Sequence, residues 1–320
     1  MSTLLKVDNL QKHFPITGGL LRKTVGHVRA VDGISFELAV GETLGIVGES
    51  GCGKSTTGRM IAKIMEPTNG TITFEGNDIT TLKGKHLKSF RQDVQMVFQD
   101  PYASLNPRMA VQSIIGEPLV VNKVAKGKDL IHRIEQLLIT VGLRAEDRQR
   151  YPHEFSGGQR QRIGIARALA LSPKMIVADE VVSALDVSVQ SQVLNLLVEL
   201  KDKLDLSYIF ISHDLSVIRH ISDRVGVMYL GQMVEIATKD DFYNNALHPY
   251  SQALLSAAPE PTRNSKREQI ILEGEVPSPA NPPSGCPFHT RCPQAMSICS
   301  TLKPVMQERE NGQLVACHLY

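Results

Sequence analysis

A glycine-rich stretch at residues 48–55, G-E-S-G-C-G-K-S, carries the most specific chemistry in this sequence. It fits the pattern G-x-x-x-x-G-K-[ST], with an apolar run before it and a helical pattern after it. Glycines let backbone N–H groups converge on phosphate oxygens, a lysine neutralises the outer phosphates, and a hydroxyl can ligate Mg²⁺. The stretch therefore predicts a nucleoside triphosphate site for ATP or GTP. The predicted binding residues are Gly48, Glu49, Ser50, Gly51, Cys52, Gly53, Lys54, Ser55 and Thr56, with Ser55 also a Mg²⁺ ligand and Cys52 a small filler.

A second candidate is the apolar run at 175–178 that ends in two carboxylates, Asp179 and Glu180. Such a strand end suits an aspartate that holds Mg²⁺ and a glutamate that polarises an attacking water. By itself the pattern is equally compatible with an ordinary strand end. Its position downstream of a phosphate-binding loop favours the catalytic interpretation.

A third candidate lies between these two, where F-S-G-G-Q at 155–159 precedes a stretch rich in arginine. Small residues at the start of a helix expose backbone N–H groups and therefore suit an anion. The alternative is an ordinary helix with Ser156 as its N-cap and solvated arginines, and local physics alone prefers it. The residues concerned are Ser156, Gly157, Gly158 and Gln159.

Taken together, these motifs resemble in type and order those of the ATP-binding subunits of ABC transporters. The stretch 155–159 is similar to the signature motif of that family. The resemblance implies roles for further residues: Gln99 as the Q-loop glutamine and a Mg²⁺ ligand, Asp186 of the S-A-L-D stretch at 183–186 as part of the D-loop, His213 as the switch histidine, and Phe14 as the aromatic that stacks on adenine.

In this family two ATPase domains enclose two nucleotides, so the signature motif of one subunit faces the phosphate loop of the other. The resemblance therefore implies that one chain cannot build a complete site. Glu180 would activate water, His213 would contact the γ-phosphate, and Gln99 would report the state of the site to membrane subunits. One departure is Val181, which stands where many relatives have proline and which frees the backbone at that turn.

The hydrophobic pattern predicts an α/β protein. Strand-like runs at 34–38, 43–47 and 70–74 surround a helical stretch at 56–65, and helical periodicity without a convincing strand extends over about 102–171. Strand patterns at 175–178 and 208–211 flank a helical run at 188–203, which indicates a parallel sheet. The resemblance adds a RecA-like P-loop core, an antiparallel β subdomain and an inserted helical subdomain. We expect a nucleotide-binding domain at 1–235 and an extension at 236–320.

The last quarter of the chain narrows the family. The stretches H-P-Y-S-Q-A-L-L at 248–255, G-E-V-P-S-P at 274–279 and P-P-S-G-C-P-F-H-T-R-C at 282–292 resemble the ATPases of dipeptide and oligopeptide importers. The resemblance then covers essentially the whole chain. It implies a complex with a homologous second ATPase subunit, two membrane-spanning permease subunits and an extracytoplasmic peptide-binding protein.

Four of the five cysteines cluster near the C-terminus: Cys286, Cys292, Cys299 and Cys317. Four thiolates can hold Zn²⁺ or a [4Fe–4S] cluster, and unligated thiols are the remaining alternative. The wide gaps do not match the closely spaced pairs of zinc fingers. Some peptide-importer ATPases carry an iron–sulfur cluster in this region, so the resemblance favours [4Fe–4S]. His289 and His318 are possible substitute ligands.

Bulk properties exclude several classes of protein. Lysine and arginine total 35 against 33 acidic residues, so charge provides no footprint for nucleic acid. No apolar run is long enough to cross a membrane, and the N-terminus lacks the features of a secretory signal. We expect a cytoplasmic protein, bound to the inner face of the plasma membrane through its permease partners.

Two other functions are alternatives to that of a peptide importer. A soluble ABC ATPase of DNA repair or translation is disfavoured, because the sequence has one phosphate loop and no extended heptads. A non-catalytic structural subunit is disfavoured because Glu180 and His213 are present. The transported substrate is not encoded in this chain, and haem, metal or defence peptides could be moved by the same motor.

Overall fold

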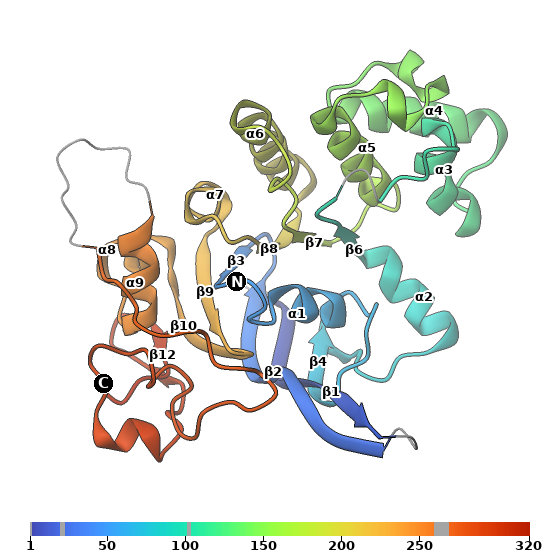
Figure 1. The fold of residues 1–320 in the computed structure, drawn as a ribbon. Coiled ribbons are helices and arrows are strands. Elements are labelled where there is room, and N and C mark those ends of the chain that lie inside the picture. Colours follow the sequence, from blue (N-terminus) through green and yellow to red (C-terminus); the bar gives the residue numbers. More distant parts are fainter. Residues whose placement is uncertain (1, 20–22, 101–103, 259–268) are drawn as a thin grey trace. The chain divides into compact units, whose positions relative to one another are not determined.

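The computed structural model describes residues 2–19, 23–100, 104–258 and 269–320 of the chain (Figure 1). Its residues form two compact units. The first comprises Met1–Ala39, Thr43–Thr81 and Ser212–Tyr320, and the second comprises Val40–Glu42 and Leu82–Ile211. Residue 102, where the predicted helical insertion begins, lies outside the described residues. No helix in the described part of the chain is both long and apolar enough to span a membrane.

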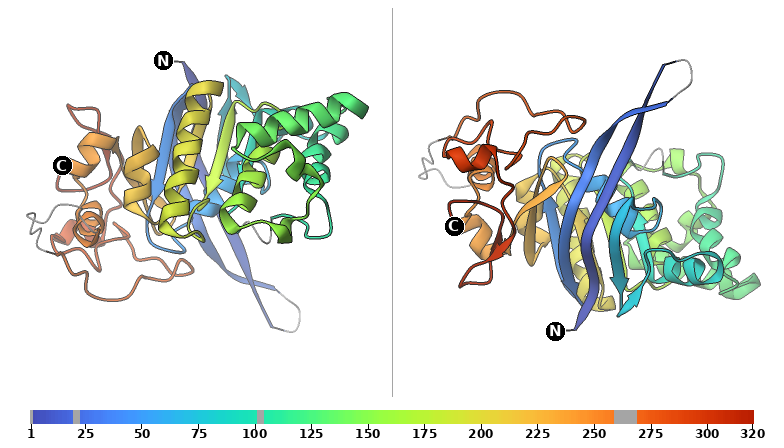
Figure 2. Two further views of the ribbon diagram at one scale, coloured as in Figure 1. Left: turned by 90° about the horizontal axis from the view of Figure 1, so that it is seen from above. Right: turned by 90° about the horizontal axis from the view of Figure 1, so that it is seen from below.

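An antiparallel sheet forms one layer of the first unit, with strands in the order β2 (Lys23–Ala39), β1 (Thr3–Gly18), β4 (Asn69–Phe74) and β5 (Asn77–Asp78). The long β1–β2 hairpin is drawn in blue in Figure 2. In β2, Ile34, Phe36 and Leu38 are buried while the residues between them are exposed. This alternation places one face of the sheet against the core, as is usual for antiparallel strands.

A second group of strands in the first unit runs in the order β11 (Gln307–Glu308), β12 (Leu314–Val315), β10 (Gln232–Thr238), β9 (Arg224–Tyr229) and β3 (Thr43–Val47). Strand β3 pairs in parallel with β9, and all five of its residues are buried. Parallel strands covered on both faces are apolar throughout, which explains the run T-L-G-I-V. Helices α1 (Lys54–Ile61) and α7 (Leu215–Ile221) belong to the same unit.

The C-terminal extension of the first unit shares strand β10 with the nucleotide-binding part, so the boundary expected at residue 235 falls inside a strand. It contains α8 (Lys239–Asn245), α9 (Pro249–Ala257) and a short 3₁₀ helix, Ser297–Ser300. The buried carboxylate of Glu235 accepts the backbone N–H groups of Leu247 and His248 at 2.8 and 2.9 Å. Burial lowers the pKa of His248 to about 3, so the neutral ring can accept the backbone N–H of Tyr250 through Nδ1.

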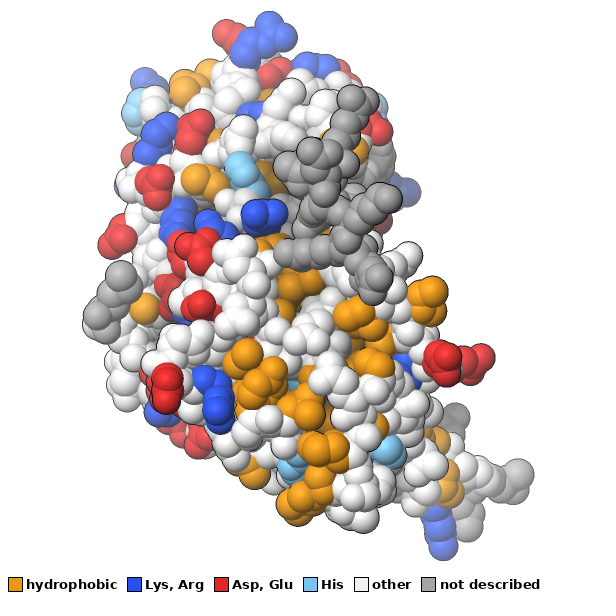
Figure 3. All heavy atoms as spheres, turned by 90° about the vertical axis from the view of Figure 1, so that its left-hand side faces the viewer, with side chains coloured by type: hydrophobic (Ala, Val, Ile, Leu, Met, Phe, Trp, Pro, Cys, Tyr) orange, Lys and Arg blue, Asp and Glu red, His pale blue; other side chains and the backbone are white. Residues whose placement is uncertain are grey.

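The surface of the extension is partly apolar. Figure 3 views the side of the protein that carries it, and hydrophobic side chains gather there. Exposed apolar residues of the extension include Ile271, Val276, Ile298, Leu302 and Val305. These exposed side chains contribute nothing to the buried interior of the extension, so its attachments to the sheet help to hold it in place.

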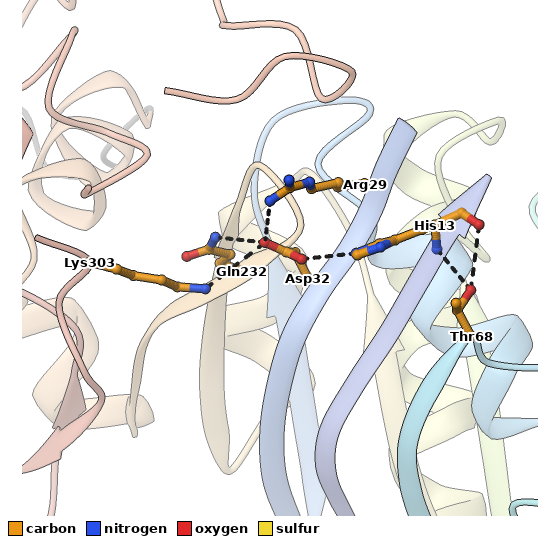
Figure 4. A network of polar contacts seen from close by, with 6 residues as sticks. All are labelled: His13, Arg29, Asp32, Thr68, Gln232 and Lys303. Carbon is orange, nitrogen blue, oxygen red and sulfur yellow. Dashed lines mark hydrogen bonds and ion pairs between the residues drawn. The ribbon is translucent and has the colours of Figure 1, made fainter. Parts of the chain in front are cut away.

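One such attachment is a polar network around Asp32 of β2 (Figure 4). Nε2 of His13 lies 2.9 Å from one carboxylate oxygen of Asp32, and Nε2 of Gln232 donates to the other at 3.3 Å. Arg29 and Lys303 place cations 3.9 and 4.0 Å from the same carboxylate. Asp32 thus connects β1, β2 and β10 with the extension.

The second unit contains parallel strands in the order β8 (Ser207–Ile211), β7 (Met175–Asp179) and β6 (Val94–Val97). The predicted βαβ arrangement is confirmed, because α6 (Val187–Leu204) connects β7 to β8. Helices α2 (Gly84–Asp93), α3 (Val111–Val121), α4 (Gly127–Thr140) and α5 (Gly157–Leu169) complete the unit, with α3, α4 and α5 packed together (Figure 1). Ile134 and Leu138 of α4 are buried, as the helical spacing predicts.

Candidate nucleotide site

The phosphate-binding loop joins β3 to α1 in the first unit, and its backbone requires glycine. Gly53, the N-cap of α1, has a φ of 106°, and Gly48 has a φ of 151°. A Cβ at Gly53 would lie 2.2 Å from the carbonyl oxygen of Ala30. Only glycine fits such a position, so these residues allow the tight turn in which N–H groups can face an anion.

Lys54 folds back over this loop. Its side chain is 4% exposed, and Nζ donates to the carbonyl oxygens of Gly48 at 2.7 Å and Glu49 at 3.0 Å. The ammonium group is therefore held within the loop, beside the N-terminus of α1. Burial raises the pKa of the neighbouring Cys52 thiol, although Lys54 partly offsets this. A neutral buried thiol fits the predicted role of Cys52 as filler.

Two contacts hold the start of the loop from outside it. The backbone N–H of Glu49 donates to the hydroxyl of Tyr250 at 2.9 Å. The carboxylate of Glu49 accepts both hydrogen bonds of a forked contact from Nη1 of Arg291, at 2.9 and 3.1 Å. Sequence reasoning did not identify Tyr250 or Arg291 as functional, because neither contact has a local signature.

The structure places two other predicted residues in the first unit with the loop. Phe14 is half-buried in β1, and Nζ of Lys12 lies 5.2 Å from the centroid of its ring. His213 is exposed and precedes Asp214, which caps α7 by accepting the N–H of Ser216 at 2.8 Å. The cap fixes the backbone next to His213 while its imidazole stays open to solvent.

The carboxylate end of β7 lies in the second unit. Asp179 is buried, and Glu180 has a φ of 50°, which is unusual for a residue other than glycine. The backbone around Glu180 is held in this conformation on both sides: its N–H donates to the carbonyl oxygen of Ile211 at 2.9 Å, and its carbonyl oxygen accepts from the hydroxyl of Ser183 at 2.9 Å. Seven other described non-glycine residues also have a positive φ, so what distinguishes Glu180 is its position directly after β7.

Gln99 follows β6, the strand that pairs with β7, and it reaches the catalytic candidate directly. Its Nε2 donates to Oε2 of Glu180 at 2.7 Å. An amide N–H that donates to one carboxylate oxygen orients the carboxylate group. The structure thus brings together two of the three predicted catalytic residues.

Val181, which stands where many members of the family have proline, is buried together with Val182. Val181 and Val182 are 1% and 2% exposed, so both anchor the turn after Glu180 in the apolar interior. Burial of two β-branched side chains restricts the backbone that a proline would otherwise restrict. The departure from the family pattern therefore leaves the turn anchored.

The signature-like stretch opens α5. Ser156 is its N-cap, and it forms a reciprocal pair with Gln159: the Ser156 hydroxyl accepts the N–H of Gln159, and Oε1 of Gln159 accepts the N–H of Ser156. Gly158 packs so closely that a Cβ there would lie 2.2 Å from Cγ1 of Val189 in α6. Asp186 is the N-cap residue of α6. The N-cap expected for Ser156 on local grounds is confirmed.

The second unit also contains a groove of about 450 Å³ beside α2 and the end of α3. Its lining is mixed, with two cations, several amides and apolar side chains. The lining residues are Gly84, Leu87, Lys88, Arg91, Gln92, Gln95, Pro118, Val121, Asn122 and Leu171.

The four C-terminal cysteines lie in the first unit as free thiols, with Cys286 and Cys299 buried. Burial raises the pKa of Cys286 to about 11, and the backbone N–H of Cys286 donates to the carbonyl oxygen of Cys299 at 2.8 Å. Across the described ranges, however, no three His, Cys, Asp or Glu side chains are arranged to hold a metal ion. Four thiols are suitable ligands for zinc or an iron–sulfur cluster, but in the present arrangement they do not form a metal site.

Known proteins similar to this chain are ATP-binding transport proteins. Residues 31–183 match the family described as ABC transporter, and residues 234–299 match the C-terminal region of oligopeptide/dipeptide transporters. The oligopeptide transport ATP-binding protein AppF of Bacillus subtilis is 57% identical over 99% of this chain and 98% of its own. The dipeptide transport ATP-binding protein DppF of Escherichia coli is 51% identical over 98% of this chain and 93% of its own.

Solved structures lead to the same family. A dimeric ATP-binding cassette, MJ0796, solved in a post-hydrolysis state with ADP and phosphate, matches with a TM-score of 0.65 and 26% identity over 74% of this chain and 99% of its own. CbiO1 of Clostridium perfringens, part of an ABC transporter complex, matches with a TM-score of 0.65 and 27% identity over 77% of this chain and 92% of its own. The present chain therefore belongs to the ATP-binding subunits of ABC transporters.

Proposed function

We propose that this chain binds and hydrolyses ATP to drive the import of dipeptides or short oligopeptides. The hydrogen bond from Gln99 to Glu180 carries the proposal for hydrolysis, because it holds in place a carboxylate that directly follows β7 and could take a proton from water. The names of the relatives, which are oligopeptide and dipeptide transport proteins, support the substrate class.

In this proposal residues 48–56 bind the phosphates of ATP and Phe14 stacks on its adenine. Ser55, Asp179 and Gln99 would hold Mg²⁺, which when bound would neutralise charge on the β- and γ-phosphates. Three features of the chain fit the group: the hydroxyl next to Lys54, the buried carboxylate of Asp179, and the glycine-shaped loop. Glu180 takes the water proton, and His213 contacts the γ-phosphate.

The residues 156–159 and Asp186 act on a second nucleotide, held by a partner ATPase. Backbone N–H groups at the start of α5 and its helix dipole would face the γ-phosphate from the opposite side. Binding of ATP then closes a pair of ATPase subunits, and loss of the phosphate lets the pair reopen.

The partners in this proposal are a homologous ATPase subunit, two permease subunits and an extracytoplasmic peptide-binding protein. We place the chain on the cytoplasmic face of the inner membrane, bound through the permeases. The groove beside α2 supports this, because its mixed lining with Lys88 and Arg91 suits a short amphipathic segment of a permease. Val121 lines the groove, and Val120 and Val124, close to it in sequence, are also exposed apolar side chains.

The isolated chain is predicted to hydrolyse ATP slowly, because the second half of each site comes from another subunit. Phosphate release should rise by about 10²-fold or more when the chain is extracted with its membrane complex. Mass spectrometry of that complex should identify the second ATPase. Full activity of ATP-induced homodimers, with no other polypeptide present, would contradict the prediction.

The rival functions give different purification results. A soluble ATPase of DNA repair or translation would co-purify with DNA or ribosomes, whereas the importer subunit should co-purify with membrane proteins. Uptake of labelled dipeptide, tripeptide and haem into cells that lack this chain would distinguish peptide transport from transport of another substrate.

We further propose that the four C-terminal cysteines hold a [4Fe–4S] cluster. Support comes from the four cysteines themselves: Cys286 and Cys299 are buried and lie side by side, with the backbone N–H of Cys286 donating to the carbonyl oxygen of Cys299 at 2.8 Å. The group would have a structural role, as a staple for residues 286–317. Binding requires the side chains to converge further than they do in the present arrangement.

Anaerobically purified protein is then expected to be brown, with about four iron and four sulfide per chain, as a single [4Fe–4S] cluster requires. Replacing Cys299 with serine should bleach it, while replacing Cys52 should not. Colourless protein with stoichiometric zinc would identify a zinc site instead. Protein without iron, sulfide or zinc would reject a metal group altogether.

A further inference from the structure

Two residues of the C-terminal extension contact Glu49 of the phosphate-binding loop. Nη1 of Arg291 lies 2.9 Å from one oxygen of the Glu49 carboxylate and 3.1 Å from the other. The side chain of Arg291 is 9% exposed and that of Glu49 is 28% exposed. The hydroxyl of Tyr250 meanwhile accepts the backbone N–H of Glu49. Two groups from the extension therefore hold the first residue after Gly48, one by its side chain and one by its backbone.

Both of these groups are rigidly mounted. The ring of Tyr250 is fully buried, and its centroid lies 4.7 Å from that of Tyr229 and 5.4 Å from that of Phe288. Phe288, also fully buried, belongs to the same turn as Arg291, whose backbone N–H donates to its carbonyl oxygen at 3.0 Å. Packed aromatic rings thus fix the turn from which Arg291 reaches the loop.

Glu49 creates an electrostatic problem that Arg291 solves. A loop that binds the phosphates of ATP should not present a carboxylate beside them, because like charges at short range repel. The Arg291 guanidinium cancels that charge and, through its forked contact, keeps the carboxylate turned toward the extension. Tyr250 meanwhile satisfies an N–H at the start of the loop, which leaves the later N–H groups to meet the anion.

We propose that Arg291 and Tyr250 are positioning residues for ATP binding: Arg291 neutralises Glu49, and Tyr250 fixes the start of the phosphate-binding loop. The extension then contributes to nucleotide affinity as well as to the fold. This inference rests on the proposed role of residues 48–56 in binding ATP.

The test measures the dissociation constant of MgATP for the full-length chain by calorimetry. Arg291→Ala is expected to weaken binding about tenfold, and Glu49→Gln in the same chain is expected to restore it to within about threefold. The single Glu49→Gln variant is the reference for the double variant, and in that background Arg291→Ala should change the dissociation constant by less than about threefold. Tyr250→Phe should weaken binding several-fold without rescue by Glu49→Gln, because it acts on the backbone N–H.

Two controls separate the possible causes of a loss. Lys303→Ala removes another cation with which the extension contacts a carboxylate, that of Asp32 rather than that of Glu49, and binding should stay unchanged. Lys54→Ala tests the proposed ATP site itself and should abolish detectable binding. Retained binding in Lys54→Ala would reject the site, whereas unchanged binding in Arg291→Ala with loss in Lys54→Ala would reject only the present inference.

The rescue decides between neutralisation of charge and general damage. A loss in Arg291→Ala that Glu49→Gln does not repair, or an equal loss in Lys303→Ala, would overturn the proposed role of Arg291. Binding by Tyr250→Phe that equals that of the parent chain would overturn the role of Tyr250. If Arg291→Ala does not fold, Arg291→Met keeps the packing of the stem, and the same tenfold loss and rescue are required of it.

Discussion

Replacing Glu180 with glutamine should leave MgATP binding within a few-fold of the parent chain and slow phosphate release by about 10²–10⁴-fold. The amide has nearly the same shape, so an oxygen can still accept the hydrogen bond from Gln99. It has no basic carboxylate oxygen to take a proton from water. Because we propose that a partner subunit completes each site, phosphate release should be measured on the assembled complex.

A matched control for this prediction is Glu199→Gln, which changes an exposed carboxylate on α6 of the same unit. Phosphate release by the Glu199 variant should equal that of the parent. Near-normal turnover in Glu180→Gln would remove Glu180 from the catalytic role. A parallel loss of MgATP binding would instead assign it a structural role in the turn after β7.

Local motifs in this chain were predictable because their geometry is written in consecutive residues. The phosphate-binding loop needs glycine at Gly48 and Gly53, and the structure shows positive φ at both positions. The strand ending at Asp179 and the N-cap at Ser156 follow from the same kind of local signal. In each case a short stretch fixes both the element and the direction in which its polar groups point.

Contacts between distant residues were not predictable. Glu49 lies 201 positions from Tyr250 and 242 from Arg291, and no periodicity connects them. No feature of the sequence indicated that residue 235, the expected domain boundary, lies inside strand β10. That strand pairs with β12, 80 residues further along the chain, through Glu235 and Val315. The left-handed conformation of Glu180 is also a tertiary effect, because it depends on Ile211.

A substitution in the first turn of α5, at Gly158, is expected to have the second large effect on phosphate release. Gly158→Ala adds a methyl group whose ideal position lies 2.2 Å from Cγ1 of Val189, so the Val189 side chain or one of the two helices, α5 or α6, must shift. Overpacking of this kind costs about 1–3 kcal/mol. If it displaces the N-terminus of α5, which we propose faces the partner's nucleotide, by about 1 Å, the substitution should slow phosphate release by the complex about 10²-fold.

Two further variants decide whether Gly158 acts through this displacement. Val189→Ala in the Gly158→Ala chain removes the clashing methyl groups and should restore most of the phosphate release. Gly164→Ala, on the same helix with open space around its Cβ position, should leave it unchanged. An equal loss in Gly164→Ala would show a general effect on the helix, and a loss that Val189→Ala fails to repair would show that the backbone of Gly158 itself must approach the nucleotide. MgATP binding by the isolated chain should be unaffected in all three variants, since the proposed phosphate site of this chain lies at residues 48–56.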